Sequence, residues 1–194
     1  MSISRRDVLK SLAMGAAATS VLRTIPAQAA EYAHRMVAAE KAAATVYAPK
    51  FFPAHQYKTL QTLCQTIIPA DSDSGGAIEA GAPEFIDLLT SENTEYQVKL
   101  GGGLMWLDGT CSDRYGKLYL DCTPQQQKEI LDQIAYRNNA VTDPSISQGV
   151  EFFSFLRNMT ADGFFTSEIG IKYLGYIGST FLKEFPGCPP VPGL

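Results

Sequence analysis

The sequence predicts an all-α protein with a single packed domain. Apolar residues recur at the three- and four-residue spacing of a helix face in several stretches, and proline or threonine stands where those helices would begin. No stretch shows the apolar–polar alternation typical of a strand. The chain has 194 residues, which suits one ordinary domain. We therefore expect a small helical bundle with an irregular C-terminal segment rich in aromatic residues and glycine.

The first 29 residues have the order of an export signal, in which basic residues precede a short apolar stretch and a cleavage site. The residues on which this prediction rests are Arg5, Arg6, Leu9, Lys10, Ala27 and Ala29. The paired arginines resemble a twin-arginine signal, although Val8 stands where that motif usually has phenylalanine. We expect export to the periplasm by the twin-arginine translocase, with cleavage after Ala29. An ordinary secretory signal and a retained N-terminal anchor are the alternatives.

Residues 30–50 are rich in alanine and carry scattered charges. We predict a tether or a frayed helix that ends near Pro49, so the packed domain is expected to span residues 51–194. Its first helix should cover residues 54–68, where apolar residues share one face, and Pro69 should end it. A polar loop over residues 71–76 should follow.

Pro83 is expected to open a second, short helix. A third helix is predicted for residues 94–115, although it includes three consecutive glycines at 101–103, which indicate either the close approach of another helix or a break. Thr123 and Pro124 form a typical helix start. Residues 138–147 are predicted to be a loop. Residues 148–163 should form the most aromatic helix, and the chain after Phe164 should be loop-like.

The composition excludes several classes of protein. With 45% hydrophobic and 19% charged residues, the chain is neither disordered nor collagen-like, and only its N-terminus offers a long uncharged stretch, which excludes a polytopic membrane protein. The formal charge is −4 and no basic run occurs in the body of the chain, so nucleic acid is not expected as a partner.

The motifs predict no catalytic, cofactor-binding or metal-binding residues in this chain. Asp71 and Asp73 begin like a calcium loop, but Ala82 stands where the bidentate glutamate is needed. No Cys-x-x-Cys pair occurs, which argues against zinc, iron–sulfur and covalent haem sites. His34 and His55 have no recognisable catalytic partner in the sequence.

Four cysteines in an exported chain allow three pairings into disulfides. Cys111 and Cys122 bracket a predicted helix end and form the most plausible local pair. Cys64 lies on an apolar helix face, as a buried free thiol would. Cys188 is left to pair with Cys64 or to reach a partner subunit.

Several segments together resemble the gluconate 2-dehydrogenase subunit 3 family. They are residues 60–71 (LQTLCQTIIPAD), 76–81 (GAIEAG), 85–87 (FID), 152–156, 160–167 (TADGFFTS), 174–178 (LGYIG) and 187–188, so the resemblance covers roughly residues 50–190. Ser179 stands where asparagine is expected.

The resemblance implies a non-catalytic small (gamma) subunit of a periplasmic dehydrogenase complex. Its partner would be a large flavoprotein of the glucose-methanol-choline type, which holds FAD and oxidises a sugar, a sugar acid or a glycoside. A c-type cytochrome with haem would be a further subunit, and the complex could associate with the membrane. The small subunit would carry the signal and escort the folded flavoprotein. A free periplasmic chaperone or binding module and an independent enzyme are the rival interpretations.

The segment after the aromatic helix is the expected contact surface for that partner. Its candidate interface residues are Phe164, Phe165, Tyr173, Leu174 and Tyr176. Aromatic residues are enriched at the cores of protein interfaces, and a loop-like segment must either bury them in its own core or offer them to a partner. At the sequence level these two alternatives have similar weight.

Overall fold

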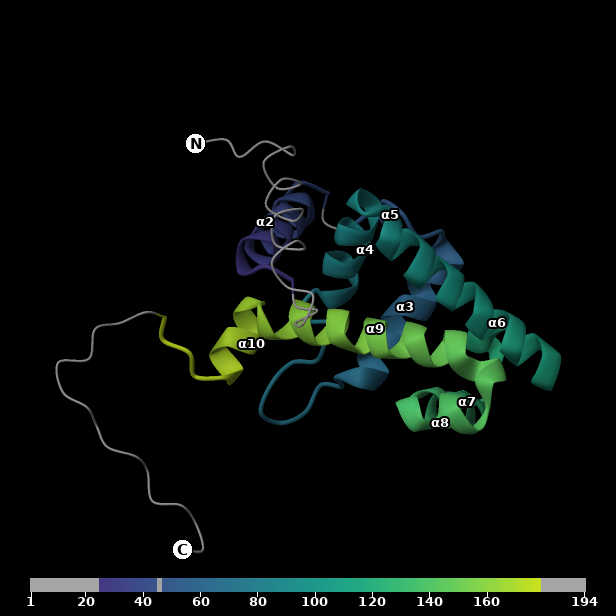
Figure 1. The fold of residues 1–194 in the computed structure, drawn as a ribbon. Coiled ribbons are helices and arrows are strands. Elements are labelled where there is room, and N and C mark those ends of the chain that lie inside the picture. Colours follow the sequence, from purple (N-terminus) through teal and green to yellow (C-terminus); the bar gives the residue numbers. More distant parts are fainter. Residues whose placement is uncertain (1–24, 45–46, 179–194) are drawn as a thin grey trace, which may run out of the picture.

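A computed structural model describes residues 25–44 and 47–178, and within them the chain forms helices and no strand (Figure 1). The all-α prediction is therefore confirmed. The elements are α2 (Ala27–Ala44), α3 (Ala54–Ile67), α4 (Ala82–Glu92), α5 (Thr94–Tyr96), the π-helical turn η1 (Gln97–Gly101), α6 (Gly102–Tyr115), the 3-10 turn η2 (Tyr119–Asp121), α7 (Pro124–Ile134), α8 (Arg137–Thr142), the 3-10 turn η3 (Pro144–Ile146), α9 (Ser147–Phe165) and α10 (Glu168–Tyr173). None of the helices in these described ranges is long and apolar enough to cross a bilayer.

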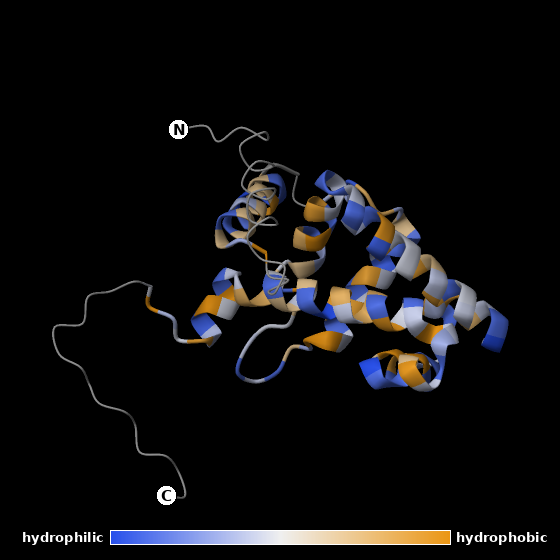
Figure 2. Cartoon of the chain, in the orientation of Figure 1, coloured by the Kyte–Doolittle hydropathy of each residue, from blue (hydrophilic) through white to orange (hydrophobic). Residues whose placement is uncertain are grey.

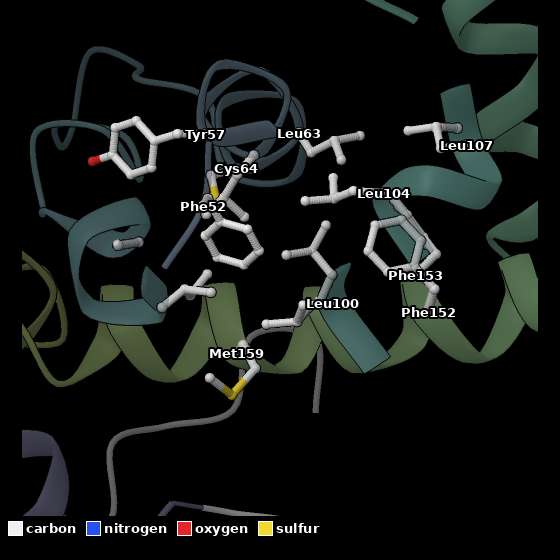
Figure 3. Packing of buried hydrophobic residues seen from close by; sticks show 14 of the residues in the cluster. Phe52, Tyr57, Leu63, Cys64, Leu100, Leu104, Leu107, Phe152, Phe153 and Met159 are labelled. Atoms are coloured by element: carbon white, nitrogen blue, oxygen red, sulfur yellow. The ribbon is translucent and has the colours of Figure 1, made fainter. Parts of the chain in front are cut away.

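Helix α9 forms the centre of the fold. It contacts α3, α4, α6, α7, α8 and α10, and Figure 1 shows it running across the molecule with α10 at one end. Its buried Phe152, Phe153 and Met159 meet Leu63 of α3 and Leu104 of α6 in one continuous core (Figure 3). The aromatic helix predicted over residues 148–163 is thus confirmed and extends to Phe165.

Three other predicted helices are also present. The first covers Ala54–Ile67 and the second Ala82–Glu92 with a proline in its first turn, as expected. Helix α7 begins with a capping box, in which the Thr123 side chain accepts a hydrogen bond from the Gln126 N–H and the Gln126 side chain accepts one from the Thr123 N–H. The physical signals in the sequence therefore located these helix starts.

The predicted helix over residues 94–115 is divided into α5, η1 and α6. The close approach suggested by the three glycines occurs at Gly103, where an added Cβ would lie 2.0 Å from the Phe152 ring of α9. A side chain at this position would push α6 away from α9. The prediction of helix contact is confirmed for this glycine.

For residues 30–50 the sequence predicted a tether or a frayed helix, and the structure has a helix that packs on the domain. Helix α2 occupies most of this segment, and its Ala30, Ala33 and Val37 belong to the hydrophobic core against α4. Small side chains let the two helices approach closely, so a segment with a weak apolar pattern still packs. Figure 1 shows α2 beside α4, which makes it a part of the domain.

Two segments predicted as loops are helical. Helix α8 (Arg137–Thr142) overlaps the first half of the predicted loop over residues 138–147. Its Asn139 side chain donates a 2.8 Å hydrogen bond to the Gln133 carbonyl, and Ala140 packs on the core. Helix α10 follows α9 in the segment expected to be loop-like. Both helices have six residues and depend on contacts with the rest of the fold, because isolated helices of that length are unstable.

The connection between α2 and α3 is held by the buried carboxylate of Asp87 on α4. One oxygen accepts hydrogen bonds from the Tyr47 hydroxyl (2.8 Å) and the Lys50 N–H (2.6 Å). The other accepts from the N–H groups of Phe51 (3.1 Å) and Phe52 (3.0 Å). Four donors therefore converge on one fully buried carboxylate.

Candidate functional site

Among the residues that the structure describes, six exposed apolar side chains lie on α10 or within a few residues of it. They are Phe165, Ile171, Tyr173, Leu174, Tyr176 and Ile177, each between 38% and 72% exposed, and we call this group the aromatic surface. Figure 2 shows apolar bands on α10, which lies at the edge of the helical body. Soluble monomers rarely expose so many large apolar side chains within a few residues.

Phe164 lies behind the aromatic surface. Its side chain is only 2% exposed, so its place among the expected interface residues is corrected: it belongs to the protein's own interior. The Phe165 ring packs edge-on against it at 5.1 Å, and the Tyr173 ring lies 6.4 Å away. Of the five expected interface residues, Phe164 is therefore buried in the chain's own core, while the other four are exposed on the surface.

The turn between α9 and α10 fixes the direction of the aromatic surface. The Ser167 hydroxyl caps α10 by accepting from the Gly170 N–H (3.1 Å), and it donates to the Phe164 carbonyl (2.7 Å). At Gly170 an added Cβ would lie 2.1 Å from the Phe164 carbonyl oxygen. Only glycine lets α10 pack this closely on the end of α9.

The C-terminus of α10 places Tyr176 on the same side as Ile171. Gly175, with a φ of 63°, ends the helix in the left-handed conformation, and its N–H donates to the Lys172 carbonyl. The Tyr176 N–H donates to the Ile171 carbonyl at 3.2 Å. This is a Schellman motif, in which an apolar contact between the two bonded residues is common. Local structure therefore gathers the aromatic surface before any partner binds.

The chemistry of this surface suits binding. Its side chains are aliphatic or aromatic, with hydroxyl groups only on the two tyrosines, and the charged neighbours Glu168 and Lys172 lie on the same short helix. When such side chains are buried against another protein, each Å² of apolar area removed from water stabilises the contact by about 25 cal/mol. Tyrosine and phenylalanine are among the residues enriched in interface cores.

The other residues singled out in the sequence lie apart from this surface. Arg5, Arg6, Leu9 and Lys10 lie outside the described residues, as does Cys188. Ala27 and Ala29 lie in the first turn of α2. The prediction of an export signal is not tested by the fold.

Cys111 and Cys122 are brought together. Both are buried and their side chains are within hydrogen-bond contact, as free thiols in this structure. Burial raises the pKa of Cys111 to about 12, so it is the opposite of a reactive thiolate. Their pairing as a disulfide stays a prediction. Cys64 is fully buried beside Thr160, in agreement with its expected role as a core thiol.

His55 has a partner that the sequence did not reveal. Its Nε2 lies 2.8 Å from a carboxylate oxygen of Asp108, whose other oxygen accepts from the Tyr119 N–H at 3.0 Å. The pair connects α3 to α6 and to η2. The 53 residues between His55 and Asp108 explain why no sequence motif shows it.

No metal site is found in the described ranges, 25–44 and 47–178, where no group of three His, Cys, Asp or Glu side chains lies close enough to hold an ion. Asp71 instead closes a turn, because its carboxylate accepts from the N–H groups of Asp73 and Ser74. A pocket of about 490 Å³ between α3, α7 and α9 is lined mainly by apolar atoms, with Lys128 and Asp132 at its side.

His34 connects α2 to the end of α9. The Thr166 hydroxyl donates to the Asp162 carbonyl, so it accepts at 2.8 Å from the His34 ring N–H. The imidazole also stacks on Phe85 of α4, with 4.9 Å between the ring centroids. Burial lowers the pKa of His34 below its ordinary 6.5. The neutral ring is therefore the form that the folded chain accommodates.

Acidification should weaken this contact. Because the folded chain has the lower pKa at His34, the unfolded chain takes up the proton first, and stability is lost as the pH falls below about 6.5. Burial also raises the pKa of Asp162, and this acts in the opposite direction, because at that carboxyl the folded chain takes up a proton before the unfolded chain does. Urea unfolding should give a lower free energy at pH 5.5 than at pH 7.5. His34→Gln, which keeps an N–H donor, should reduce that difference, and an unchanged difference would contradict the assignment.

Comparison of the chain with models of protein families gives a match. The family model described as gluconate 2-dehydrogenase subunit 3 matches residues 54–187. The chain belongs to this family. The resemblance found in the sequence is thereby confirmed, and the match begins at the first residue of α3. Comparison with curated proteins and comparison with solved structures gave no match.

The gluconate 2-dehydrogenase subunit 3 family describes a small subunit of a dehydrogenase complex, which implies a larger dehydrogenase partner. Two of the segments that carried the resemblance build the aromatic surface. Residues 160–167 form the end of α9 with Phe164 and Ser167, and residues 174–178 contain the Schellman motif and Tyr176. These two segments contain Phe165, Leu174, Tyr176 and Ile177 of the aromatic surface.

Proposed function

We propose that this chain is the non-catalytic small subunit of a periplasmic, FAD-dependent dehydrogenase that oxidises a sugar, a sugar acid or a glycoside. It carries the export signal and escorts and stabilises the large glucose-methanol-choline-type flavoprotein. The large subunit holds the FAD, and a c-type cytochrome accepts the electrons and links the complex to the membrane. This proposal rests on one observation: a chain that belongs to a family of dehydrogenase subunits exposes an aromatic surface that a partner could cover.

The aromatic surface supports a lasting contact with the flavoprotein. Phe165, Tyr173 and Tyr176 are between 41% and 61% exposed, and the rings of Phe165 and Tyr173 pack on the buried Phe164 at the capped start of α10. A surface ordered before binding loses little conformational entropy when it is covered. A free chaperone, the alternative interpretation, would leave the flavoprotein after export and would be missing from the purified complex.

If this chain escorts the flavoprotein, export of both proteins should depend on the twin-arginine signal of this chain. Arg5→Lys with Arg6→Lys should leave both this chain and the flavoprotein in the cytoplasm, because the twin-arginine route requires the pair. An ordinary secretory signal needs only positive charge and would tolerate this change. Arg23→Lys, in the same leader but outside the pair, is the matched control. Cell fractionation with antibodies to both chains measures the result, and periplasmic flavoprotein in the double variant would contradict the proposal.

A further inference from the structure

The predicted cleavage site lies inside a helix. The bond between Ala29 and Ala30 belongs to the first turn of α2, and both alanines are only 1% exposed. Their N–H groups donate to the Pro26 carbonyl at 2.9 and 3.1 Å. In the folded chain this peptide bond is therefore both helical and buried.

A peptidase requires the bond in a different state. Cleavage of a folded protein generally proceeds from a locally opened form, because the protease must surround the backbone. Helical hydrogen bonds and the packing of Ala29 and Ala30 both prevent that approach. The first turn of α2 has to leave its neighbours before hydrolysis.

The rest of α2 resists this opening. Ala33 and Val37 are buried in the core, where α2 packs on α4. His34 donates to Thr166 and stacks on Phe85. Lys41 pairs with the mostly buried carboxylate of Glu84 at 2.7 Å. Contacts from two other elements, α4 and the end of α9, therefore hold the helix.

The start of the described chain is held as well. The carboxylate of Asp162 on α9 accepts a hydrogen bond from the Ile25 N–H, just before α2. Pro26, which follows, supplies the carbonyl that begins the helix. The chain is thus attached to α9 at Ile25, four residues before Ala29, while Ala27 and Gln28 are exposed.

We infer that the packing of α2 on α4 and on the end of α9 controls removal of the export signal, here called the leader. A signal peptidase hydrolyses the Ala29–Ala30 bond only from the state in which the first turn of α2 is open, consuming one water and leaving a carboxylate on Ala29 and an amine on Ala30. A chain exported after folding then keeps its leader until α2 opens. This inference rests on the proposed export function.

The test compares cleavage of the purified full-length chain with cleavage of a synthetic peptide of residues 20–40, which has no fold to protect the bond. A purified signal peptidase in detergent micelles is added to each, and mass spectrometry follows the product that begins at Ala30. We expect the folded chain to be cleaved at least about tenfold more slowly than the peptide.

Variants that loosen α2 should bring the rate towards that of the peptide. His34→Ala removes the contacts with Thr166 and Phe85, and Ala33→Asp places a charge in the core. Arg35→Ala, whose ion pair with Glu31 is exposed, is the matched control and should be cleaved like the wild type. Circular dichroism verifies that the core stays folded, and the milder His34→Ala keeps the test valid if Ala33→Asp unfolds.

Two results would overturn the inference, and they differ in meaning. If the folded wild type is cleaved as fast as the peptide, α2 does not control processing, while the export function stands. If the peptide itself is not cleaved between Ala29 and Ala30, the predicted cleavage site is wrong and the inference fails, while export with a retained signal stands and is tested by the Arg5→Lys, Arg6→Lys variant.

Discussion

Asp87→Ala should lower the free energy of unfolding by about 3–5 kcal/mol. The substitution leaves the Tyr47 hydroxyl and the N–H groups of Lys50, Phe51 and Phe52 without the acceptor that they share. Each buried donor without a partner costs about 1–3 kcal/mol, and relaxation of the connection between α2 and α3 recovers a part. Urea unfolding followed by circular dichroism measures the loss.

Asp113→Ala is the matched control for this prediction, since Asp113 is exposed on α6. It should change the free energy of unfolding by no more than about 0.5 kcal/mol. Asp87→Asn should fall between the two, because an amide offers one acceptor oxygen where the carboxylate offers two. A loss below about 1 kcal/mol for Asp87→Ala would contradict the account of the α2–α3 connection.

The triple substitution Phe165→Ala, Tyr173→Ala and Tyr176→Ala should weaken association with the large subunit at least about tenfold, equivalent to about 1.4 kcal/mol. The three side chains are 41%, 51% and 61% exposed, and none belongs to the buried core, so the chain should stay folded. Buried aromatic residues at an interface commonly contribute more than 1 kcal/mol each. Co-purification of the two chains at controlled concentrations measures the effect.

A second triple substitution tests whether the position of the apolar side chains matters. Val98→Ala, Tyr136→Ala and Val141→Ala remove side chains that are at least 68% exposed but lie on other elements. This control should assemble like the wild type. If it dissociates the complex and the first triple does not, the partner binds elsewhere and the aromatic surface is not the interface.

Much of the fold could be predicted from local signals. Pro83, Thr123 and Pro124 mark helix starts through their fixed φ or capping side chain, and the apolar spacing over residues 54–68 and 148–163 indicates which faces are buried. Gly103 correctly indicated a close helix contact. These features act over a few residues, so the sequence alone reveals them.

The elements that were missed depend on contacts distant in sequence. Helix α2 buries mainly alanines, which have little apolar signal, and its place is set by His34 and Thr166, 132 residues apart. Helix α10 requires Gly170 to approach the Phe164 carbonyl. Its one local signal was Ser167, a capping residue before Glu168.

The candidate site was predicted in part. The sequence located the apolar segment, and the structure separates Phe164, which supports it from within, from the four other expected residues, which lie on the surface. Which side chains near the turn between α9 and α10 are buried depends on how the two helices pack, and the local sequence pattern does not encode this. Ile171 and Ile177 complete the surface, and the Schellman motif that joins Ile171 to Tyr176 could have been suspected from Gly175.

The most direct test of the central proposal is purification of the C-terminally tagged chain from the periplasm of its own cell, followed by a visible spectrum and mass spectrometry. The account predicts a yellow, near-equimolar complex with a large flavoprotein, and haem bands if the cytochrome is retained. A colourless protein that purifies alone would contradict the subunit function and would favour a free escort or binding protein.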